Sequence, residues 1–422
     1  MNLLIKSAKI VDSNSPHNGK KVDILIENGI IKSIKSTIKD KSVKNIEVEN
    51  LHASPGWFDM QVNFRDPGFE YKEDLISGTE AAAHGGFTGV AVMPSTHPPI
   101  HTKADIEYIK NKTVNSIVDV YPIGALSHKM DGKDISEMYD MHQSGAVAFS
   151  DDKQPILNAG LLLRALMYAK NFNGLVVTHC DDKNVSLDGK INEGETSTML
   201  GLKGIPALAE ELMVARNIYL AEYAETGIHI SSVSTAKSVE LIRQAKSRKL
   251  KITASVNAYN LILDDSSLKD FDTNYKVNPP LRTKADIEAL KKGLIDGTID
   301  AIVSDHSPED EENKKVEFDH AAFGMIGLET TFAAANTNRG KMSLEKLISK
   351  ISINPRKILN LPIPEIKEEA EANLTFFDPD KKWKFEEKYI HSKSKNTPFI
   401  GTVFQGKALG IYNKGKLQLS KQ

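Results

Sequence analysis

The chain has 422 residues, of which 40% are hydrophobic and 26% charged, and its 54 basic and 56 acidic residues leave a formal charge of −2. This length suffices for one large domain with a smaller one attached. The balanced charge argues against nucleic acid or an anionic membrane as a partner. No signal-peptide pattern and no apolar run of membrane-spanning length occurs. The single cysteine, Cys180, excludes an intramolecular disulfide and suits a reducing compartment, so we expect a cytoplasmic protein.

The first fifty residues predict β-structure, with short apolar or alternating runs at 3–5, 22–26 and 30–34 and a hairpin turn signal at Asn28-Gly29. From Pro55 onward, short apolar runs alternate with longer helical patterns, such as 205–224 and 284–296. This alternation is typical of βα units around a parallel sheet. The candidate strands lie at 57–63, 88–93, 118–123, 146–149, 175–179, 228–233, 251–256 and 300–304. Eight strands are the number needed for a closed (β/α)8 barrel.

Strand-like runs return after residue 365, at 373–377, 401–404 and 409–412. We therefore predict an α/β protein in which residues 53–365 form a (β/α)8 TIM barrel. Residues 1–52 and 366–422 are predicted to pair into a small composite β-sandwich domain beside it. The charged stretch 309–315, after the eighth strand, is predicted to be a mobile loop.

Polar residues gather where the predicted barrel strands end, which is where the reacting groups of such barrels lie. They are Gln61, Asn63, Ser95, Asp151, His179, Ser232, Asn257 and Asp305. A polar ring drawn from separate strands is more typical of an active site than of ordinary solvated loops. Residues 61 and 63 are two apart on one strand, so their side chains share a face and could meet at a single site.

Several motifs in this chain resemble those of the dihydroorotases, the cyclic amidohydrolases of pyrimidine synthesis, and the match is closest to the long bacterial type within the amidohydrolase superfamily. The matching segments are 55–68, 92–96, 148–152, 192–195, 275–282, 302–308, 323–330 and 392–399. They occur in order and cover nearly the whole chain. The resemblance implies a TIM barrel that hydrolyses a cyclic amide with a pair of zinc ions, a bound hydroxide and a carboxylate that shuttles the proton.

The resemblance also assigns roles to individual positions. One zinc would be held at positions 61, 63 and 305, the second at 179 and 232, and the bridge would be Asp151. This chain keeps Asp151, His179 and Asp305, the last being also the acid/base position, whereas Gln61, Asn63 and Ser232 stand where the family has histidines. On the substrate side, Arg65 and Asn278 match family residues, Arg282 lies in the same motif, Ser95 replaces an asparagine and Glu309 replaces a histidine.

Zinc normally takes four imidazole, thiolate or carboxylate ligands, and amides and hydroxyls are poor substitutes. We therefore expect no cofactor, or at most one weakly bound zinc on Asp151, His179 and Asp305. The amides and the hydroxyl can instead donate hydrogen bonds to the remaining carboxylates, and His179 would add a positive charge if it were protonated. The former metal site is then predicted to be a closed polar network.

Three functions remain open at this point. The first is a non-catalytic dihydroorotase-like protein that acts as a structural or regulatory partner of aspartate carbamoyltransferase, as the resemblance to inactive family members implies, within a homo-oligomer. The second is an active cyclic amidohydrolase with a reduced metal site, acting on dihydroorotate, a hydantoin or allantoin. The third is a binding or sensing module for a dihydroorotate-like ligand held by Arg65 and Asn278. The loss of three ligands on a preserved frame favours the first.

Overall fold

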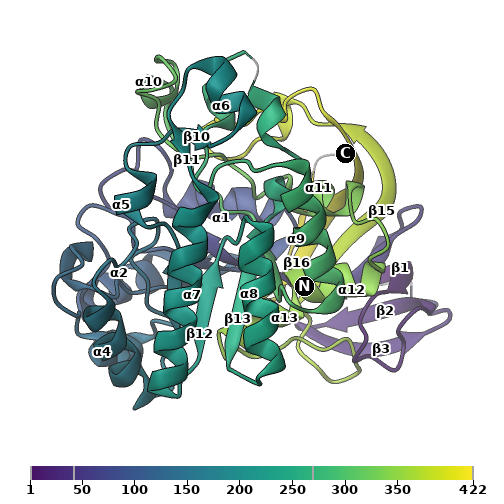
Figure 1. The fold of residues 1–422 in the computed structure, drawn as a ribbon. Helices are drawn as coiled ribbons and strands as arrows, with labels where there is room; N and C mark the ends of the chain where they lie inside the picture. The colour runs from purple at the N-terminus through teal and green to yellow at the C-terminus, as the bar shows by residue number, and fades with distance from the viewer. Residues whose placement is uncertain (1, 41–42, 269, 421–422) are drawn as a thin grey trace.

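The computed structural model describes residues 2–40, 43–268 and 270–420, and a parallel barrel forms its centre (Figure 1). Its strands are β6 (Trp57–Val62), β7 (Phe87–Val92), β8 (Asp119–Pro122), β9 (Val176–His179), β12 (Ile228–Ser231), β13 (Ile252–Asn257) and β14 (Ala301–Val303). Phe149 bridges to Gly124 and to Val176, and so fills the fourth position between β8 and β9. A bridge between Val62 and His306 closes the ring. The predicted eight-stranded barrel is confirmed.

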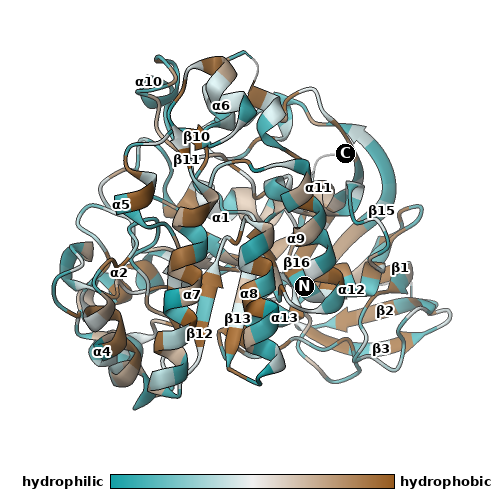
Figure 2. Ribbon diagram, viewed as in Figure 1, coloured by the Kyte–Doolittle hydropathy of each residue, from teal (hydrophilic) through white to brown (hydrophobic). Residues whose placement is uncertain are grey.

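Helices cover the outside of this barrel. They are α1 (Leu75–His84), α2 (Lys103–Thr113), α3 (Met138–Ser144), α4 (Ala159–Lys170), α7 (Ala207–Ala224), α8 (Ala236–Ser247), α9 (Lys284–Asp296), α11 (Thr331–Thr337), α12 (Leu344–Ile351) and α13 (Ile353–Ile358). In Figure 2 the apolar strands β12 and β13 lie behind α7 and α8. Helix α9 begins at a Thr283–Asp286 capping box and ends at Gly297, whose φ of 89° suits glycine. The predicted helices at 205–224 and 284–296 are confirmed.

Shorter elements build the loops at the carboxyl ends of the strands and elsewhere on the barrel. They are α5 (Lys183–Ser186), α6 (Glu195–Leu200), α10 (Glu311–Lys314), β10 (Ile191–Asn192), β11 (Gly204–Ile205) and the 3-10 turns His128–Met130, Ala258–Leu261, Asp265–Leu268, Thr273–Tyr275 and Glu387–Tyr389. The stretch 309–315 is not the free loop that its charge suggested. Glu309 is buried between two cations, and Lys314 donates to the carbonyls of Ala322 and Gly324.

Both ends of the chain meet in one sheet beside the barrel, with the order β17-β16-β15-β5-β1-β2-β3 and β4 paired to β1. Its strands are β1 (Leu3–Ile10), β2 (Lys21–Glu27), β3 (Ile30–Lys35), β4 (Lys44–Ile46), β5 (His52–Pro55), β15 (Leu374–Lys384), β16 (Val403–Asn413) and β17 (Lys416–Leu419). Residues from both ends, including Leu3, Ile24, Leu374 and Tyr412, form one buried cluster. The predicted pairing of the two chain ends in a β-domain is confirmed, but the strands form a single continuous sheet rather than the predicted sandwich. The exact domain boundaries stay a prediction.

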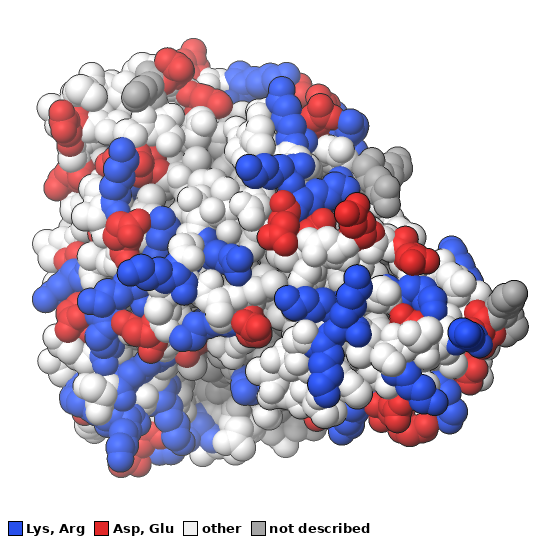
Figure 3. All heavy atoms as spheres, turned by 90° about the vertical axis from the view of Figure 1, so that its right-hand side faces the viewer, with Lys and Arg blue, Asp and Glu red and all other residues white. Residues whose placement is uncertain are grey.

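The hairpin predicted at Asn28-Gly29 joins β2 to β3, and both residues have positive φ, 50° and 84°, as a two-residue hairpin turn requires. The run at 409–412 and the second half of the run at 401–404 belong to the single strand β16. On the face drawn in Figure 3, basic and acidic groups are interspersed and neither sign dominates. Within the described part of the chain, no helix is both long and apolar enough to cross a membrane.

Candidate active site

The backbone at the carboxyl ends of four barrel strands is unusual. Arg65, Asp152, Ser232 and Asp305 have φ values of 59°, 48°, 54° and 51°. Residues other than glycine rarely adopt this left-handed region, and such conformations cluster at functional sites because the surrounding structure must hold them there. The four residues follow β6, the strand position at Phe149, β12 and β14. The mouth of the barrel therefore has the backbone of a functional site.

Asp305 is the centre of a buried hydrogen-bond network. The Nε2 atom of Gln61 donates to Asp305 Oδ1 at 2.7 Å and to Ser232 Oγ at 2.9 Å. On the other carboxylate oxygen, the Tyr259 hydroxyl donates at 2.6 Å and Asn257 Nδ2 at 3.2 Å. The bonds among Gln61, Ser232 and Asp305 are those expected of a closed polar network, and they join β6, β12 and β14 at the site where the family resemblance placed a metal.

Lys153 also lies in this network, although it was not predicted as a site residue. Its Nζ atom is 2.8 Å from Asp305 Oδ1 and 2.9 Å from Asp305 Oδ2, and it donates to the carbonyl oxygen of Asn278 at 2.6 Å. The Lys153 side chain is 23% exposed, whereas Asp305 is almost fully buried. The sequence does contain a sign of this role, because Lys153 directly follows the Asp151-Asp152 motif at the end of a predicted strand.

His179 does not supply the positive charge that a protonated ring would add to the network. Burial, followed by the nearby charge of Lys153, lowers the pKa of His179 to about 3, so the ring is neutral near pH 7. Both ring nitrogens are buried without a hydrogen bond of normal geometry. The Oδ1 atom of Asn63 is also buried without a partner. The cation in contact with Asp305 is Lys153.

The structure reassigns the aspartate of the 148–152 motif. Asp151 Oδ1 accepts the backbone N–H groups of Leu126 and Ser127 at 2.8 and 2.9 Å, and its Oδ2 accepts the Ser127 hydroxyl. Burial raises the pKa of Asp151 to about 6. Because both of its oxygens are used in holding the loop after β8, Asp151 is not placed as a bridge. Its neighbour Asp152 has the charge that interacts with Lys153, Asp305 and Arg65.

The predicted substrate-binding residues are mostly engaged by the protein itself. Arg65 donates to Glu309 Oε1 at 2.9 Å, and Lys72 contacts the other oxygen of Glu309 at 2.6 Å. Ser95 donates to Asp152 Oδ2 at 2.5 Å. Arg65 is thus already paired with an internal carboxylate.

Arg282 is a structural residue, which corrects its prediction as a substrate ligand. It is almost completely buried, and its guanidinium donates to Ser234 Oγ at 3.1 Å and to Asn192 Oδ1 and the Ile205 carbonyl at 2.8 Å each. Buried guanidinium groups need such partners, because an unpaired charge is costly to bury. Arg282 therefore ties the loop before α7 to the loop before α8.

Two other buried side chains, an imidazole and a thiol, also have partners or surroundings that remove them from the site. The ring nitrogens of His229 contact Thr253 Oγ1 at 2.9 Å and Ser255 Oγ at 3.1 Å, both on β13. Cys180 is buried, and burial raises the pKa of its thiol to about 12, which removes it as a nucleophile. Neither residue replaces a lost zinc ligand or supplies an alternative reacting group.

The residues at the former metal positions do not fit a pair of zinc ions. Zinc needs unprotonated nitrogen, sulfur or carboxylate donors, but here both oxygens of Asp305 accept hydrogen bonds and an ammonium group contacts them. Within residues 2–40, 43–268 and 270–420, no three His, Cys, Asp or Glu side chains are grouped so that they could hold a metal ion. The expectation of no cofactor, or of one weak zinc at most, stays a prediction.

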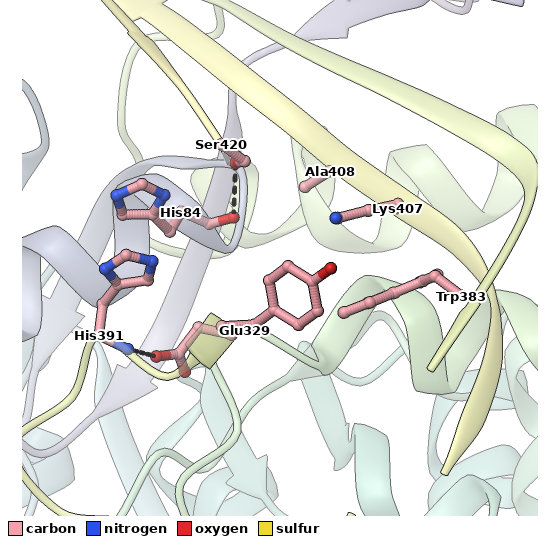
Figure 4. A pocket seen from close by; sticks show the side chains of 8 residues that line it. His84, Glu329, Trp383, His391, Lys407, Ala408 and Ser420 are labelled. Carbon is pink, nitrogen blue, oxygen red and sulfur yellow. Dashed lines mark hydrogen bonds between the residues drawn. The ribbon is translucent and has the colours of Figure 1, made fainter. Parts of the chain in front are cut away.

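A separate small hollow of about 30 Å³ lies where the terminal sheet meets the barrel (Figure 4). The rings of His84 and His391 stack there with their centroids 3.5 Å apart. Glu329 accepts the backbone N–H of His391 at 2.9 Å, and Lys407 lies over the rings of Trp383 and Tyr389. The hollow has room for about two waters at most. These contacts join the two parts of the protein.

Comparisons with known proteins agree with this architecture. A family model described as dihydro-orotase-like matches residues 53–238. The dihydroorotase of Thermoanaerobacter sp. is 44% identical over 425 residues, which cover 100% of this chain and 98% of that protein. The dihydroorotase of Syntrophus aciditrophicus is 41% identical over 422 residues, with 99% of each chain covered. The L-hydantoinase (dihydropyrimidinase) from Arthrobacter aurescens shares the fold, with a TM-score of 0.87 at 23% identity over 100% of this chain and 96% of that one. The chain belongs to the dihydroorotase family of the amidohydrolase superfamily.

Proposed function

We propose that this dihydroorotase-family protein serves pyrimidine biosynthesis without hydrolysing a cyclic amide itself, as a structural partner of aspartate carbamoyltransferase in a homo-oligomeric assembly. The observation that carries the proposal is the state of Asp305, the acid/base position. Its carboxylate accepts bonds from Gln61 and Tyr259 and forms an ion pair with Lys153. A carboxylate held in this way is poorly placed to exchange a proton with a substrate.

The missing zinc ligands support the same proposal. Metal-dependent hydrolysis needs a hydroxide, and the metal lowers the pKa of bound water from 15.7 to about 7. Gln61, Asn63 and Ser232 cannot replace three imidazoles in this role. No side chain described above supplies another activated nucleophile, since His229 is bonded to β13 and the Cys180 thiol is protonated. An active enzyme with a reduced metal site is therefore the less favoured function.

A binding or sensing module is also less favoured. An acidic ligand would have to displace Glu309, which is buried and shared between Arg65 and Lys72. The carboxylate of Glu309 is part of the same chain, so it pairs with Arg65 and Lys72 without the loss of translational freedom that a free ligand must undergo. It therefore competes effectively with a free carboxylate of similar chemistry. The frame of the barrel is nonetheless intact, and a preserved fold without its chemistry suits a role in assembly.

The hydrolysis part of the proposal is tested by assaying the purified protein in both directions, with dihydroorotate and with carbamoyl aspartate, at several zinc concentrations. We expect no turnover above the uncatalysed rate. The dihydroorotase of Thermoanaerobacter sp., assayed in parallel, is the positive control. Turnover that rises with added zinc and saturates with substrate would establish the active enzyme instead.

The assembly part is tested by mixing the protein with aspartate carbamoyltransferase from the same organism. Size-exclusion chromatography with light scattering gives the mass of each protein alone and of the mixture. We expect the protein alone to be a homo-oligomer and the mixture to form a larger complex of fixed stoichiometry. Independent elution of the two proteins at micromolar concentration would contradict the partnership, and binding of dihydroorotate by calorimetry would favour the sensing module.

A further inference from the structure

Lys153 differs from the other polar residues of the site because it is a cation at a position where the family resemblance places metal ions. Its ammonium group lies within 2.9 Å of both oxygens of Asp305 and donates to the Asn278 carbonyl. An ammonium group has three hydrogen-bond donors and no acceptor, so it binds the same carboxylate oxygens that a metal cation would bind. Lys153 therefore already satisfies the carboxylate.

Two buried carboxylates, Asp305 and Asp152, lie near Lys153. Burial and the charge of Asp305 raise the pKa of Asp152, and the positive charge of Lys153 partly offsets this effect. A buried carboxylate is stable only when it is paired and hydrogen-bonded. A divalent ion beside Asp305 would have to displace the ammonium or lie against it, and like charges at such short range repel strongly in a poorly solvated site.

We propose that Lys153 excludes divalent metal ions from the mouth of the barrel by taking the place of their charge beside Asp305. This inference rests on the proposed function, in which the protein has no working metal site, and it adds a second reason for the absence of that site. Three lost histidines remove ligands, whereas Lys153 adds a competing cation. Restoring the histidines alone is then insufficient to restore zinc binding, because the ammonium group remains on the carboxylate.

The structure also suggests which ligands become available once the ammonium group is removed. Both ring nitrogens of His179 lack a hydrogen bond of normal geometry, and Asp152 Oδ1 is buried without a partner. Neutral imidazole and free carboxylate oxygens are the donors that zinc selects. Loss of Lys153 removes the cation from Asp305, whereas the donors on Asp152 and His179 already lack partners. Because these side chains are not grouped as a metal site in the described part of the chain, zinc binding to them also requires them to move closer together.

The test compares zinc affinity in four forms of the full-length protein: the wild type, Lys153→Ala, a triple variant with Gln61→His, Asn63→His and Ser232→His, and the triple variant combined with Lys153→Ala. Zinc affinity is measured by competition with a chromophoric chelator, and zinc content by mass spectrometry after dialysis. We expect Lys153→Ala to raise the affinity at least about tenfold in either background, comparable to the 10–100-fold effects of groups around metal ligands.

Circular dichroism and elution volume establish that each variant is folded. Because the quadruple variant could fail to fold, the single Lys153→Ala comparison with wild type tests the proposal alone. Lys183→Ala is the matched control, since Lys183 pairs with Asp181 near His179 but makes no contact with Asp305. Equal zinc affinity with and without Lys153 overturns the proposal, as does an equal gain from Lys183→Ala. These readouts do not depend on turnover, so failure here and hydrolysis by the wild type are distinguishable.

Discussion

Replacing Lys153 by methionine tests the energetics of the network, because it removes the ammonium group and keeps most of the side-chain volume. At the observed 2.8–2.9 Å to Asp305, the gross Coulomb attraction is about 6 kcal/mol with an effective dielectric constant of about 20. Removing one partner of a fully buried pair costs about 3–5 kcal/mol. Lys153 is 23% exposed, so solvent screening lowers this cost toward the value of about 0–1 kcal/mol that exposed ion pairs contribute. We therefore expect Lys153→Met to lower the free energy of unfolding by about 2–3 kcal/mol.

The assay is urea unfolding, followed by fluorescence and circular dichroism. Asp305→Asn and the double variant Lys153→Met/Asp305→Asn complete a double-mutant cycle. We expect a coupling free energy of about 2 kcal/mol between the two positions, because a neutral asparagine does not lose an ion pair when Lys153 is replaced. Lys315→Met is the matched control: it breaks the exposed pair with Glu311 and should change stability by less than about 0.5 kcal/mol. If Lys153→Met cost no more than Lys315→Met, or if the cycle showed no coupling, Lys153 would not be the counter-ion of Asp305.

Two further predictions concern groups away from Asp305. Glu309→Gln leaves Arg65 and Lys72 without their shared carboxylate, so we expect the free energy of unfolding to fall by about 1–3 kcal/mol. Added succinate should raise the melting temperature of this variant but not that of the wild type, because it can bind the two unpaired cations. Equal succinate responses in variant and wild type would contradict the pairing. Burial lowers the pKa of His229 from 6.5 to about 3 in the folded protein, so the unfolded chain takes up the proton first and stability falls as the pH drops below about 6.5. Urea unfolding at pH 7, 6 and 5 should show a slope smaller by up to about 1.4 kcal/mol per pH unit in His229→Gln, and an unchanged slope would mean that His229 is not neutral in the fold.

Much of the fold could be predicted from periodicity. The eight barrel strands and the helices at 205–224 and 284–296 follow from apolar patterns that are local in the sequence. The pairing of the two chain ends was predicted from their shared β-pattern, although as a sandwich and not as the single sheet that forms. The stretch 309–315 could not be read in the same way, because its charges suggested a solvated loop. Glu309 is instead buried by two cations, Arg65 and Lys72, that are distant in the sequence.

The site was harder to predict because its side chains are placed by contacts between loops. Asp151 and Asp152 are neighbours, and only the structure shows that Asp151 holds the loop after β8. Arg282 lies in a motif with Asn278, yet its guanidinium points to other loops. Lys153 was overlooked because a lysine is not a metal ligand, although a charge that replaces a metal has to be a cation.

The decisive measurement is the zinc content of the protein, determined by mass spectrometry after purification in zinc-supplemented buffer and dialysis. We expect far less than one zinc per chain, together with an equal melting temperature in the presence of zinc or of a chelator. Two zinc ions per chain, with a melting temperature that falls on chelation, would show that amides and a hydroxyl can hold the family's metals here and that the barrel mouth is a working metal site.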